Sequence, residues 1–392
     1  MRDSRIRVME IIARMSGGAA RHVIELHQLR NPEEFDHRVY TGYVDVDESD
    51  LLRLRSATVP VHRVPGLGRS IRPTDDYRAL THLITSMRAF RPHIVHTRTA
   101  KAGALGRLAA RLSGVGSAQV HTFHGHLLYG YFSGPKRYFY VQAERFLASM
   151  SDRLETVGFQ VRDDLLKAGI GRPEQYVVIP PGIQLAPVPD REAARSCLGL
   201  PPDAPVVAFV GRLTHVKRLD RFVATADAVL RRVPDCRFVI CGGGELHEEV
   251  RRSIEPFQHA FRLLGWRKDV ETVYSAADVV LLTSDNEGTP LTLIEAGMAG
   301  RPAVSTRVGS VAEVVRHGDT GLLAACDTGE LAEQTVRLLS NPVLAGEMGE
   351  SARKWTLSSF GAERFVADTE ALYRSLCEEH WDRRTAERLR GK

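Results

Sequence analysis

The chain contains 392 residues, of which 43% are hydrophobic and 26% are charged. This composition is typical of globular proteins and excludes disordered, collagen-like and disulfide-stapled chains. Lys and Arg number 53 against 48 Asp and Glu, so the net charge is +5, which does not indicate a nucleic-acid-binding protein. At roughly 150 residues per domain, the length predicts two or three domains.

The first half of the chain alternates short apolar segments with longer amphipathic ones. Strands are predicted at residues 5–12, 38–43, 59–64, 93–96, 117–122, 153–157 and 176–179. Helical patterns lie between most of them, for example at 103–112. Strands without polar alternation that are joined by helices form parallel sheets buried on both faces. The pattern therefore predicts an α/β domain over residues 1–183.

A proline-rich segment at 184–205 predicts a linker and hinge, because proline fixes φ and removes amide donors. A second α/β domain is expected at 206–357, with strands at 206–210, 237–241, 261–264, 278–282 and 302–305 and helices at 219–232 and 291–299. A long C-terminal helix is expected within 358–380, followed by a solvated basic tail at 381–392. The carboxyl ends of the strands of two doubly wound domains would face a cleft, where ligands bind in such folds.

Five cysteines form no C-x-x-C pair, which indicates a reduced cytoplasmic protein without a zinc framework. No apolar run approaches the roughly 18 residues of a membrane-spanning helix, and the first ten residues are too charged for a signal peptide. We therefore expect a cytoplasmic protein. Peripheral contact with the inner face of the membrane stays open, as does the oligomeric state.

The most specific motif is a pair of glutamates eight positions apart, Glu287 and Glu295, between a predicted strand and a predicted helix. The backbone N–H groups around Gly288, Thr289 and Leu291 would point out of the helix N-terminus, where they can bind phosphate. Glu295 lies about a turn further in, where its carboxylate could accept hydrogen bonds from ribose hydroxyls. The alternative is an ordinary strand–turn–helix with one surface acid and one capping acid.

Two other loops follow predicted strands. Arg212 and Lys217 flank the loop after the strand at 206–210, and together they could hold a diphosphate and stabilise its developing charge. A solvated basic loop is the alternative. Gly17 and Gly18 follow the first strand and allow a backbone to approach a ligand closely, although the G-x-G-x-x-G dinucleotide motif is absent.

Residues that could bind a second substrate, the acceptor of a transferred group, lie in the first half of the chain. His124, in the run HTFHGH, is expected to face the cleft and to hydrogen-bond a sugar hydroxyl or a transition-state oxygen; the run has no fourth ligand for a metal. Arg98 and Lys101 could bind an anionic acceptor or form a solvated loop. Tyr129 lies in an aromatic segment that could form an acceptor-site lid, a membrane-interfacial patch or part of the core. The D-x-D sequence at 45–47 is interpreted as a surface turn, not a metal site.

The E-x7-E block, the G-R-L-x-x-x-K loop, the double glycine and HTFHGH together resemble family-four retaining glycosyltransferases, over roughly residues 6–373. The run HTRTAKAGALGRLAARLSG is most similar to the branch that serves bacterial polysaccharide and cell-envelope assembly. The resemblance implies a GT-B fold, with two Rossmann-like domains facing an interdomain cleft. The second domain would hold a nucleotide sugar, usually UDP-linked, and the first would hold the acceptor.

The resemblance also assigns roles to residues. Arg212 and Lys217 would hold the diphosphate, while Glu295 would hold the ribose and Glu287 the hydroxyls of the donor sugar. His124 would lie beside the transferred sugar. The residues expected to line the cleft near phosphate or acceptor are Gly17 and Gly18, and those expected beside the base are Leu264 and Trp266.

The implied reaction moves a hexose or N-acetylhexosamine from the nucleotide sugar, as co-substrate, to an acceptor hydroxyl with retained configuration. No cofactor and no metal are expected, because Arg212, Lys217 and the helix end at Gly288 supply positive potential. A lipid-linked saccharide, a free sugar and a small natural product all stay open as acceptors. Two alternative functions also stay open: an epimerase or phosphorylase on the same architecture, and a non-catalytic sugar-nucleotide-binding partner.

Overall fold

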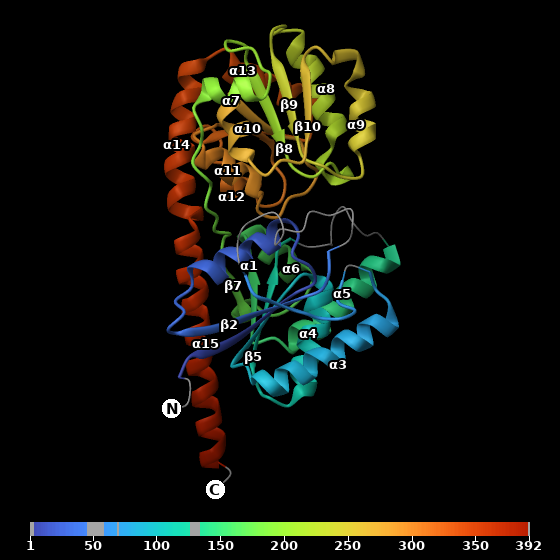
Figure 1. Ribbon diagram of the computed structural model, residues 1–392, viewed down its shortest axis with the longest axis vertical. Helices are drawn as coiled ribbons and strands as arrows, with labels where there is room; N and C mark the ends of the chain where they lie inside the picture. Colours follow the sequence, from blue (N-terminus) through green and yellow to red (C-terminus); the bar gives the residue numbers. More distant parts are fainter. Residues whose placement is uncertain (1–3, 45–58, 69, 126–133, 391–392) are drawn as a thin grey trace. The chain divides into compact units, whose positions relative to one another are not determined.

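The computed structural model describes residues 4–44, 59–68, 70–125 and 134–390, without the side chains of 134–136 and 381–390. The chain forms two compact units (Figure 1). Unit 1 comprises Met1–Ile183 and Ala362–Lys392, and unit 2 comprises Gln184–Gly361. Tyr129 and the D-x-D sequence at 45–47 lie outside the described residues.

Unit 1 contains, in its described part, a seven-stranded parallel sheet in the order β3-β2-β1-β4-β5-β6-β7. The order reverses between β1 and β4, as in doubly wound folds. The strands are β1 (Ile6–Ile12), β2 (Phe35–Thr41), β3 (Val61–Arg63), β4 (Ile94–Arg98), β5 (Ala118–Phe123), β6 (Arg153–Thr156) and β7 (Tyr176–Val178). The helices are α1 (Gly17–Leu29), α3 (Pro73–Phe90), α4 (Ala100–Ser113), α5 (Gly134–Ser149), α6 (Phe159–Lys167) and α15 (Ala362–Arg390).

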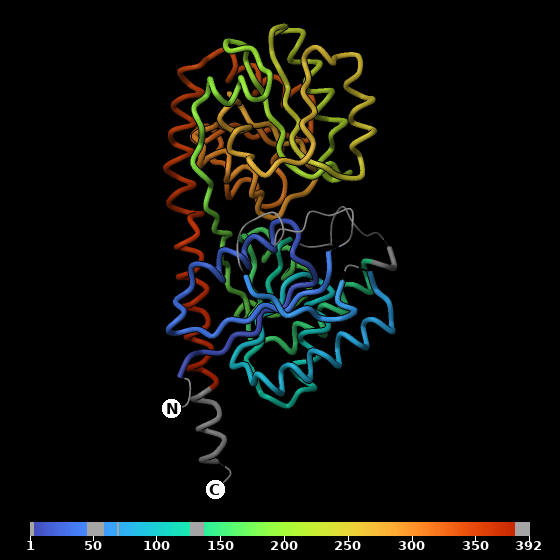
Figure 2. Tube along the Cα trace, viewed as in Figure 1, coloured from blue at the N-terminus to red at the C-terminus, as the bar shows by residue number. Residues whose placement is uncertain are grey.

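The C-terminal helix α15 completes the core of unit 1. Its Phe365, Tyr373 and Leu376 are buried against Val8 of β1 and Phe35 of β2, more than 300 positions away in the sequence. Figure 2 shows this last segment of the trace running beside the N-terminal strands. The helix extends to Arg390, beyond the expected end at residue 380, so the backbone of the segment expected to be a tail is helical.

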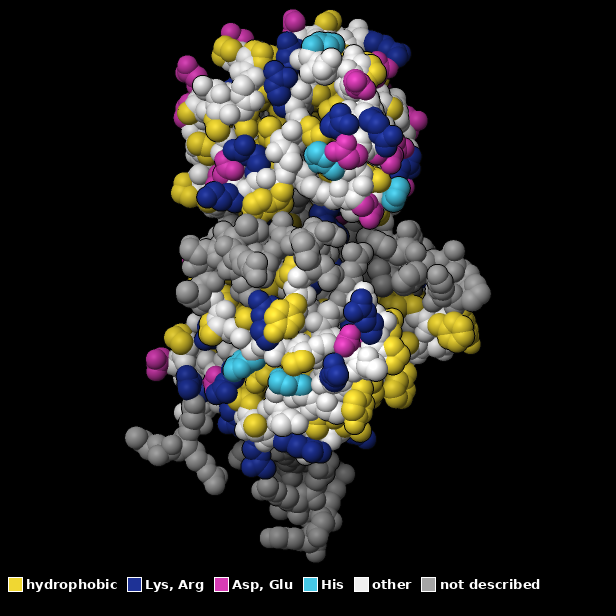
Figure 3. All heavy atoms as spheres, turned by 45° about the vertical axis from the view of Figure 1, so that its right-hand side comes forward, with side chains coloured by type: hydrophobic (Ala, Val, Ile, Leu, Met, Phe, Trp, Pro, Cys, Tyr) yellow, Lys and Arg dark blue, Asp and Glu magenta, His cyan; other side chains and the backbone are white. Residues whose placement is uncertain are grey.

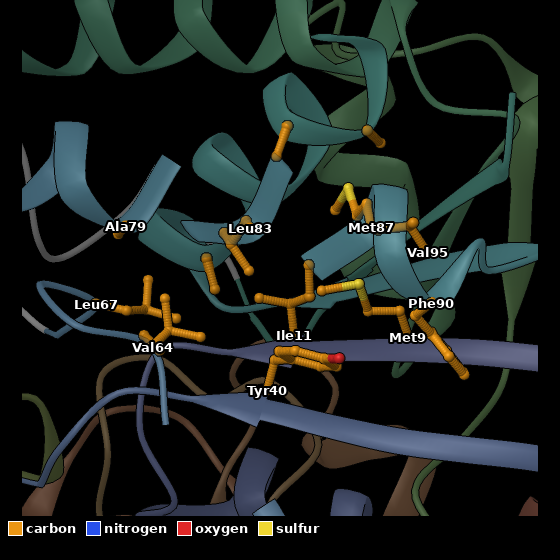
Figure 4. Close-up of a cluster of buried hydrophobic side chains, with 14 residues drawn as sticks. Met9, Ile11, Tyr40, Val64, Leu67, Ala79, Leu83, Met87, Phe90 and Val95 are labelled. Carbon is orange, nitrogen blue, oxygen red and sulfur yellow. The ribbon is translucent and has the colours of Figure 1, made fainter. Parts of the chain in front are cut away.

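The opposite face of the same sheet packs against α3 and α4 (Figure 4). Met9 and Ile11 of β1, with Tyr40 of β2, contact Leu83 and Met87 of α3 in a cluster of buried side chains. Because successive side chains of a strand point to opposite faces, Met9 and Ile11 meet α3 while their neighbour Val8 meets α15. The sheet is therefore covered on both faces.

Unit 2 contains a six-stranded parallel sheet among its described residues, in the order β10-β9-β8-β11-β12-β13. The strands are β8 (Val206–Val210), β9 (Arg237–Cys241), β10 (Phe261–Gly265), β11 (Val279–Leu282), β12 (Ala303–Thr306) and β13 (Gly321–Ala324). The helices are α7 (Arg191–Cys197), α8 (Leu219–Leu230), α9 (His247–Ser253), α10 (Val270–Ala276), α11 (Leu291–Met298), α12 (Val311–Val314), α13 (Thr328–Leu339) and α14 (Pro342–Phe360). The order reverses between β8 and β11.

The prediction of two doubly wound α/β domains is confirmed by these two sheets. The sequence pattern missed β13, because four residues that begin with a glycine carry little periodicity and β13 is defined by its pairing with β12. It also missed α7, which lies inside the segment expected to be a linker and is capped by the Asp190 carboxylate.

The surface shows no large field of one charge on the face drawn in Figure 3. There, lysine and arginine side chains of unit 2 are interspersed with aspartate and glutamate side chains. Such a mixed surface fits the small net charge of +5.

Candidate functional site

The loops after β8 and β11 meet at the point where the strand order of unit 2 reverses. Lys217 lies in the 3-10 turn His215–Lys217 after β8, and Glu287 lies in the loop between β11 and α11. The Lys217 Nζ donates to Glu287 Oε1 at 2.5 Å, and both side chains are largely shielded from solvent. Two of the residues singled out in the sequence are thus brought together at the edge where ligands of such sheets bind.

The neighbouring backbone fixes the position of Glu287. Ser284 Oγ donates to Glu287 Oε1 at 2.5 Å, and Thr306 Oγ1 at the end of β12 donates to the Ser284 carbonyl at 2.7 Å. Gly309 has φ = +48°, and a Cβ there would lie 1.8 Å from the Glu287 carbonyl oxygen. Only glycine therefore allows the β12 loop to approach Glu287 this closely.

Glu295 lies inside α11 and is 5% exposed. The buried Tyr274 of α10 donates its O–H to Glu295 Oε2 at 2.7 Å. This bond fixes the direction of the carboxylate at the second position of the E-x7-E block. No sequence motif links Tyr274 to Glu295, so only the folded chain reveals this contact.

Two arginines that the sequence analysis missed support the same loops. Arg221 of α8 donates to the Thr283 carbonyl at 2.7 Å and forms an ion pair with Asp285 at 2.8 Å. Arg218, which adopts a left-handed conformation with φ = 52°, forms an ion pair with Asp285 at 3.0 Å. The G-R-L-x-x-x-K loop is therefore tied to the β11 loop through backbone and side chains. The R-x-x-R spacing of Arg218 and Arg221, directly after Lys217, is the sequence feature that could have identified them.

The remaining donor candidates lie at the same edge of the sheet. Arg212 is exposed and forms no ion pair with another described residue. Trp266, just after β10, exposes 46% of its surface, and Leu264 is half-buried. Gly288, Thr289 and Leu291 at the start of α11 are half-buried.

In unit 1, the double glycine opens α1. Gly17 and Gly18 are exposed, Gly17 has φ = +73°, and no other heavy atom lies within 4 Å of the position of a Cβ at Gly17. His124 follows β5, and burial together with nearby His22 and Arg98 holds the pKa of His124 well below its usual value. His124 is thus neutral at physiological pH.

Arg98 and Lys101, expected at the acceptor site, are instead engaged within unit 1. Arg98 is fully buried and forms ion pairs with Glu10, and with Glu155 at 3.6 Å. Lys101 forms an ion pair with Asp76 at 2.6 Å. The alternative of a solvated loop therefore does not hold for Arg98, and both positive charges are balanced by carboxylates from distant segments. A role of Arg98 and Lys101 at the acceptor stays a prediction.

A directional chain of hydrogen bonds extends from α15 to this buried charge cluster. Thr122 Oγ1 donates to Glu155 at 3.0 Å, so it must accept from His96 Nε2 at 2.6 Å. His96 Nδ1 is then the acceptor for the Tyr373 hydroxyl of α15 at 2.6 Å. Burial lowers the pKa of His96 to about 3, which keeps its ring neutral.

No group of three or more His, Cys, Asp or Glu that could hold a metal ion occurs among the described residues. Of the helices in the part of the chain that the structure describes, none combines the length and apolar character needed to cross a bilayer.

Both units match models of known glycosyltransferase families. Residues 204–341 match a family model described as glycosyl transferases group 1, and residues 17–182 match a glycosyl transferase 4-like domain. The chain is 28% identical over 381 residues to the UDP-Gal:alpha-D-GlcNAc-diphosphoundecaprenol alpha-1,3-galactosyltransferase of Escherichia coli, covering 94% of this chain and 97% of that protein. It is 33% identical over 281 residues to a D-inositol 3-phosphate glycosyltransferase of Actinosynnema mirum, covering 66% and 67%.

Solved structures share the fold. Anabaena HepE in complex with UDP and glucose aligns with a TM-score of 0.78 at 19% identity, covering 94% of this chain and 99% of that chain. The sucrose-phosphate synthase of Thermosynechococcus elongatus aligns with a TM-score of 0.80 at 21% identity, covering 95% and 99%. With the two matched family models and the paired Lys217 and Glu287, these findings mean that the chain belongs to the family-four glycosyltransferases of the GT-B fold.

Proposed function

We propose that this glycosyltransferase moves a hexose or an N-acetylhexosamine from a UDP-sugar to a hydroxyl of a lipid-linked saccharide, with retained configuration and without a metal ion. The observation that carries the proposal is the Lys217–Glu287 pair at the reversal point of unit 2. A lipid-linked acceptor is supported by the Escherichia coli relative, whose name specifies a diphosphoundecaprenol substrate. The reaction would take place on the cytoplasmic face of the membrane.

In the proposed donor complex, the diphosphate lies between Arg212, Lys217 and the start of α11. Arg212 is exposed and can form two hydrogen bonds to phosphate, while Lys217 supplies a compact charge beside it. The backbone N–H groups at Gly288 and Thr289 would add donors at the positive end of the helix dipole. Four sources of positive potential would thus replace a divalent cation.

The rest of the donor would be held by side chains already described. Glu295, oriented by Tyr274, would accept hydrogen bonds from the ribose hydroxyls. The exposed ring of Trp266 would contact the base. Glu287 would hydrogen-bond the hydroxyls of the transferred sugar, and the bond that Lys217 donates fixes the position of its carboxylate.

The chemical step exchanges one bond for another at the anomeric carbon. The acceptor oxygen forms a bond to this carbon from the face that the diphosphate leaves, while the bond to the diphosphate oxygen breaks. The acceptor proton passes to a diphosphate oxygen, so atoms and charge balance without a protein base. Lys217 and Arg212 stabilise the negative charge of the leaving group, and unit 1 would position the acceptor through Gly17, Gly18 and His124.

A screen of purified protein against UDP-, GDP- and ADP-sugars tests the donor assignment. We expect slow hydrolysis of a UDP-sugar, a raised melting temperature with UDP because a ligand that binds the native state stabilises it, and no loss of activity in excess EDTA. Adding a diphosphoundecaprenol-linked saccharide should accelerate turnover, and NMR of the product should show the anomeric configuration of the donor. Activity with GDP- or ADP-sugars alone, or loss of activity in EDTA, would contradict the proposal.

A further inference from the structure

Two imidazole rings of unit 1 lie against each other where α1 meets the end of β5. The ring centroids of His22 and His124 are 5.1 Å apart, with the ring planes inclined by 42°. The ring of Phe365 from α15 lies 5.4 Å from that of His22. His22 is 3% exposed, so its ring is fixed by packing between an aromatic ring and His124.

The Nε2 atoms of both rings are buried and have no hydrogen-bond partner among the described residues. Other interior histidines differ, since His27 bonds to His37 and His96 bonds to both Tyr373 and Thr122. A buried polar atom without a partner lowers stability, whereas phenylalanine would fill the space of His22 without this penalty. An imidazole at position 22 therefore indicates a partner beyond the described residues.

Both rings are neutral, which limits what that partner can be. Burial lowers the pKa of His22 to about 3 and that of His124 well below its usual value. The positive charge of Arg98 lowers the pKa of both rings, and the negative charge of Glu10 offsets this effect only in part. His96 and His121 are the other titratable groups near His124. A neutral imidazole offers an N–H or a lone pair at Nε2, so two such rings can offer one of each. A hydroxyl group, which donates once and accepts, matches this pair better than an anion.

We propose that His22 and His124 together bind one sugar hydroxyl, which donates to the Nε2 of one ring and accepts from the Nε2–H of the other. The inference rests on the proposed function, because that function supplies two substrates with sugar hydroxyls. His124 was already a candidate, whereas His22 is a new binding residue contributed by α1.

The test compares the same substitution at two histidines of α1. In H22F, a phenyl ring replaces the imidazole, so the unpartnered Nε2 is lost together with Nδ1. We expect a melting temperature equal to or above that of the wild type but a fall in kcat/KM on the order of tenfold, the effect of one lost hydrogen bond. In H27F, the bond to His37 is lost, so we expect a lower melting temperature and unchanged kcat/KM. In H22Q, which keeps a polar group near the position of Nε2, we expect partial recovery of kcat/KM.

Two assays identify which substrate carries the hydroxyl. A raised KM in donor hydrolysis without acceptor would assign it to the donor sugar, and a change confined to the acceptor KM in transfer would assign it to the acceptor. Wild-type kinetics in H22F would overturn the inference, and a lower melting temperature with unchanged KM would indicate only a structural water.

If the wild type transfers no sugar, the proposed function fails. The pair is then tested by NMR of the two ring nitrogens during titration with monosaccharides, and unmoved signals would overturn it.

Discussion

At the scale of single residues, unit 2 holds the cation that we propose to stabilise the leaving group. Lys217 and Glu287 lie 70 positions apart in the sequence, and their bond forms only because β8 and β11 are neighbours in the sheet. Ser284 adds a second donor to the same Glu287 oxygen. The carboxylate and the ammonium group are therefore positioned before any ligand arrives, which lowers the cost of organising them during the reaction.

The K217A variant tests this role. Removing the ammonium group should lower kcat/KM by about 100-fold or more, the range found when one charge-stabilising donor is removed. Steady-state kinetics with the preferred donor provide the measurement. The matched control is K354A, because Lys354 is an exposed lysine of the same unit that forms an ion pair with Glu350 at 3.4 Å, and it should keep wild-type kinetics. Equal activity in K217A and K354A would favour a non-catalytic sugar-nucleotide-binding protein.

A second residue-scale prediction concerns the buried Arg98. In R98M, Glu10 loses its main counter-charge in the interior of unit 1, and breaking a buried pair in this way costs about 3–5 kcal/mol of unfolding free energy. Urea denaturation followed by circular dichroism measures the change. The R251A variant, which breaks an exposed pair with Glu248, should leave stability nearly unchanged, because exposed ion pairs are screened by solvent. A cost for R98M as small as that for R251A would argue against the buried pair.

At the scale of elements, α15 belongs to the core of unit 1 although it follows unit 2 in the sequence. It supplies Phe365, Tyr373 and Leu376 to one face of the sheet, and the Tyr373 hydroxyl bonds to His96 at the centre. Arg374 adds an ion pair with Glu34 at 2.6 Å, near the start of β2. Unit 1 therefore needs residues from both ends of the chain to close its core.

Truncation tests the contribution of α15. A chain ending at Gly361 should lose the cooperative unfolding of unit 1 and expose apolar surface, because several fully buried side chains are removed. A chain ending at His380 keeps every α15 residue of that cluster and should melt within a few degrees of the full chain. Differential scanning calorimetry and dye binding distinguish the two. Cooperative unfolding of both units in the shorter chain would contradict this role of α15.

At the scale of the whole molecule, the buried histidines make stability depend on pH. Burial lowers the pKa of His22 and of His96 to about 3 in the folded chain, whereas both titrate near 6.5 when unfolded. Between these values the unfolded chain binds protons that the folded chain does not, so stability rises with pH in this window. Their contribution is complete above about pH 6.5 and is lost progressively as the pH falls toward 3.

Urea denaturation at pH 7, 6 and 5 tests this dependence. The two histidines together should reduce the unfolding free energy by nearly 3 kcal/mol per pH unit well below pH 6.5, as an order of magnitude. In H22F, which removes one of several buried histidines with a lowered pKa, the slope should fall by about 1.4 kcal/mol per pH unit. An unchanged slope in H22F would mean that His22 does not contribute to the acid sensitivity.

The sequence alone determined the class of fold and the positions of the loops that carry the donor motifs. Strand and helix periodicity is local, so β8 and β9 were predicted with the bounds that the structure has, and Arg212, Lys217, Glu287 and Glu295 were placed at strand ends. A match over both halves of the chain to family models confirmed the family.

The tertiary structure decided which of these residues meet and which are hidden. Arg98 has the sequence context of a surface loop, but Glu10 and Glu155, 88 and 57 positions away, enclose it because their strands belong to one sheet. The contact of His22 with His124 and the bond of Tyr274 to Glu295 likewise join elements that no local pattern connects. Burial and pairing depend on contacts between distant segments, and only the folded chain brings those segments together.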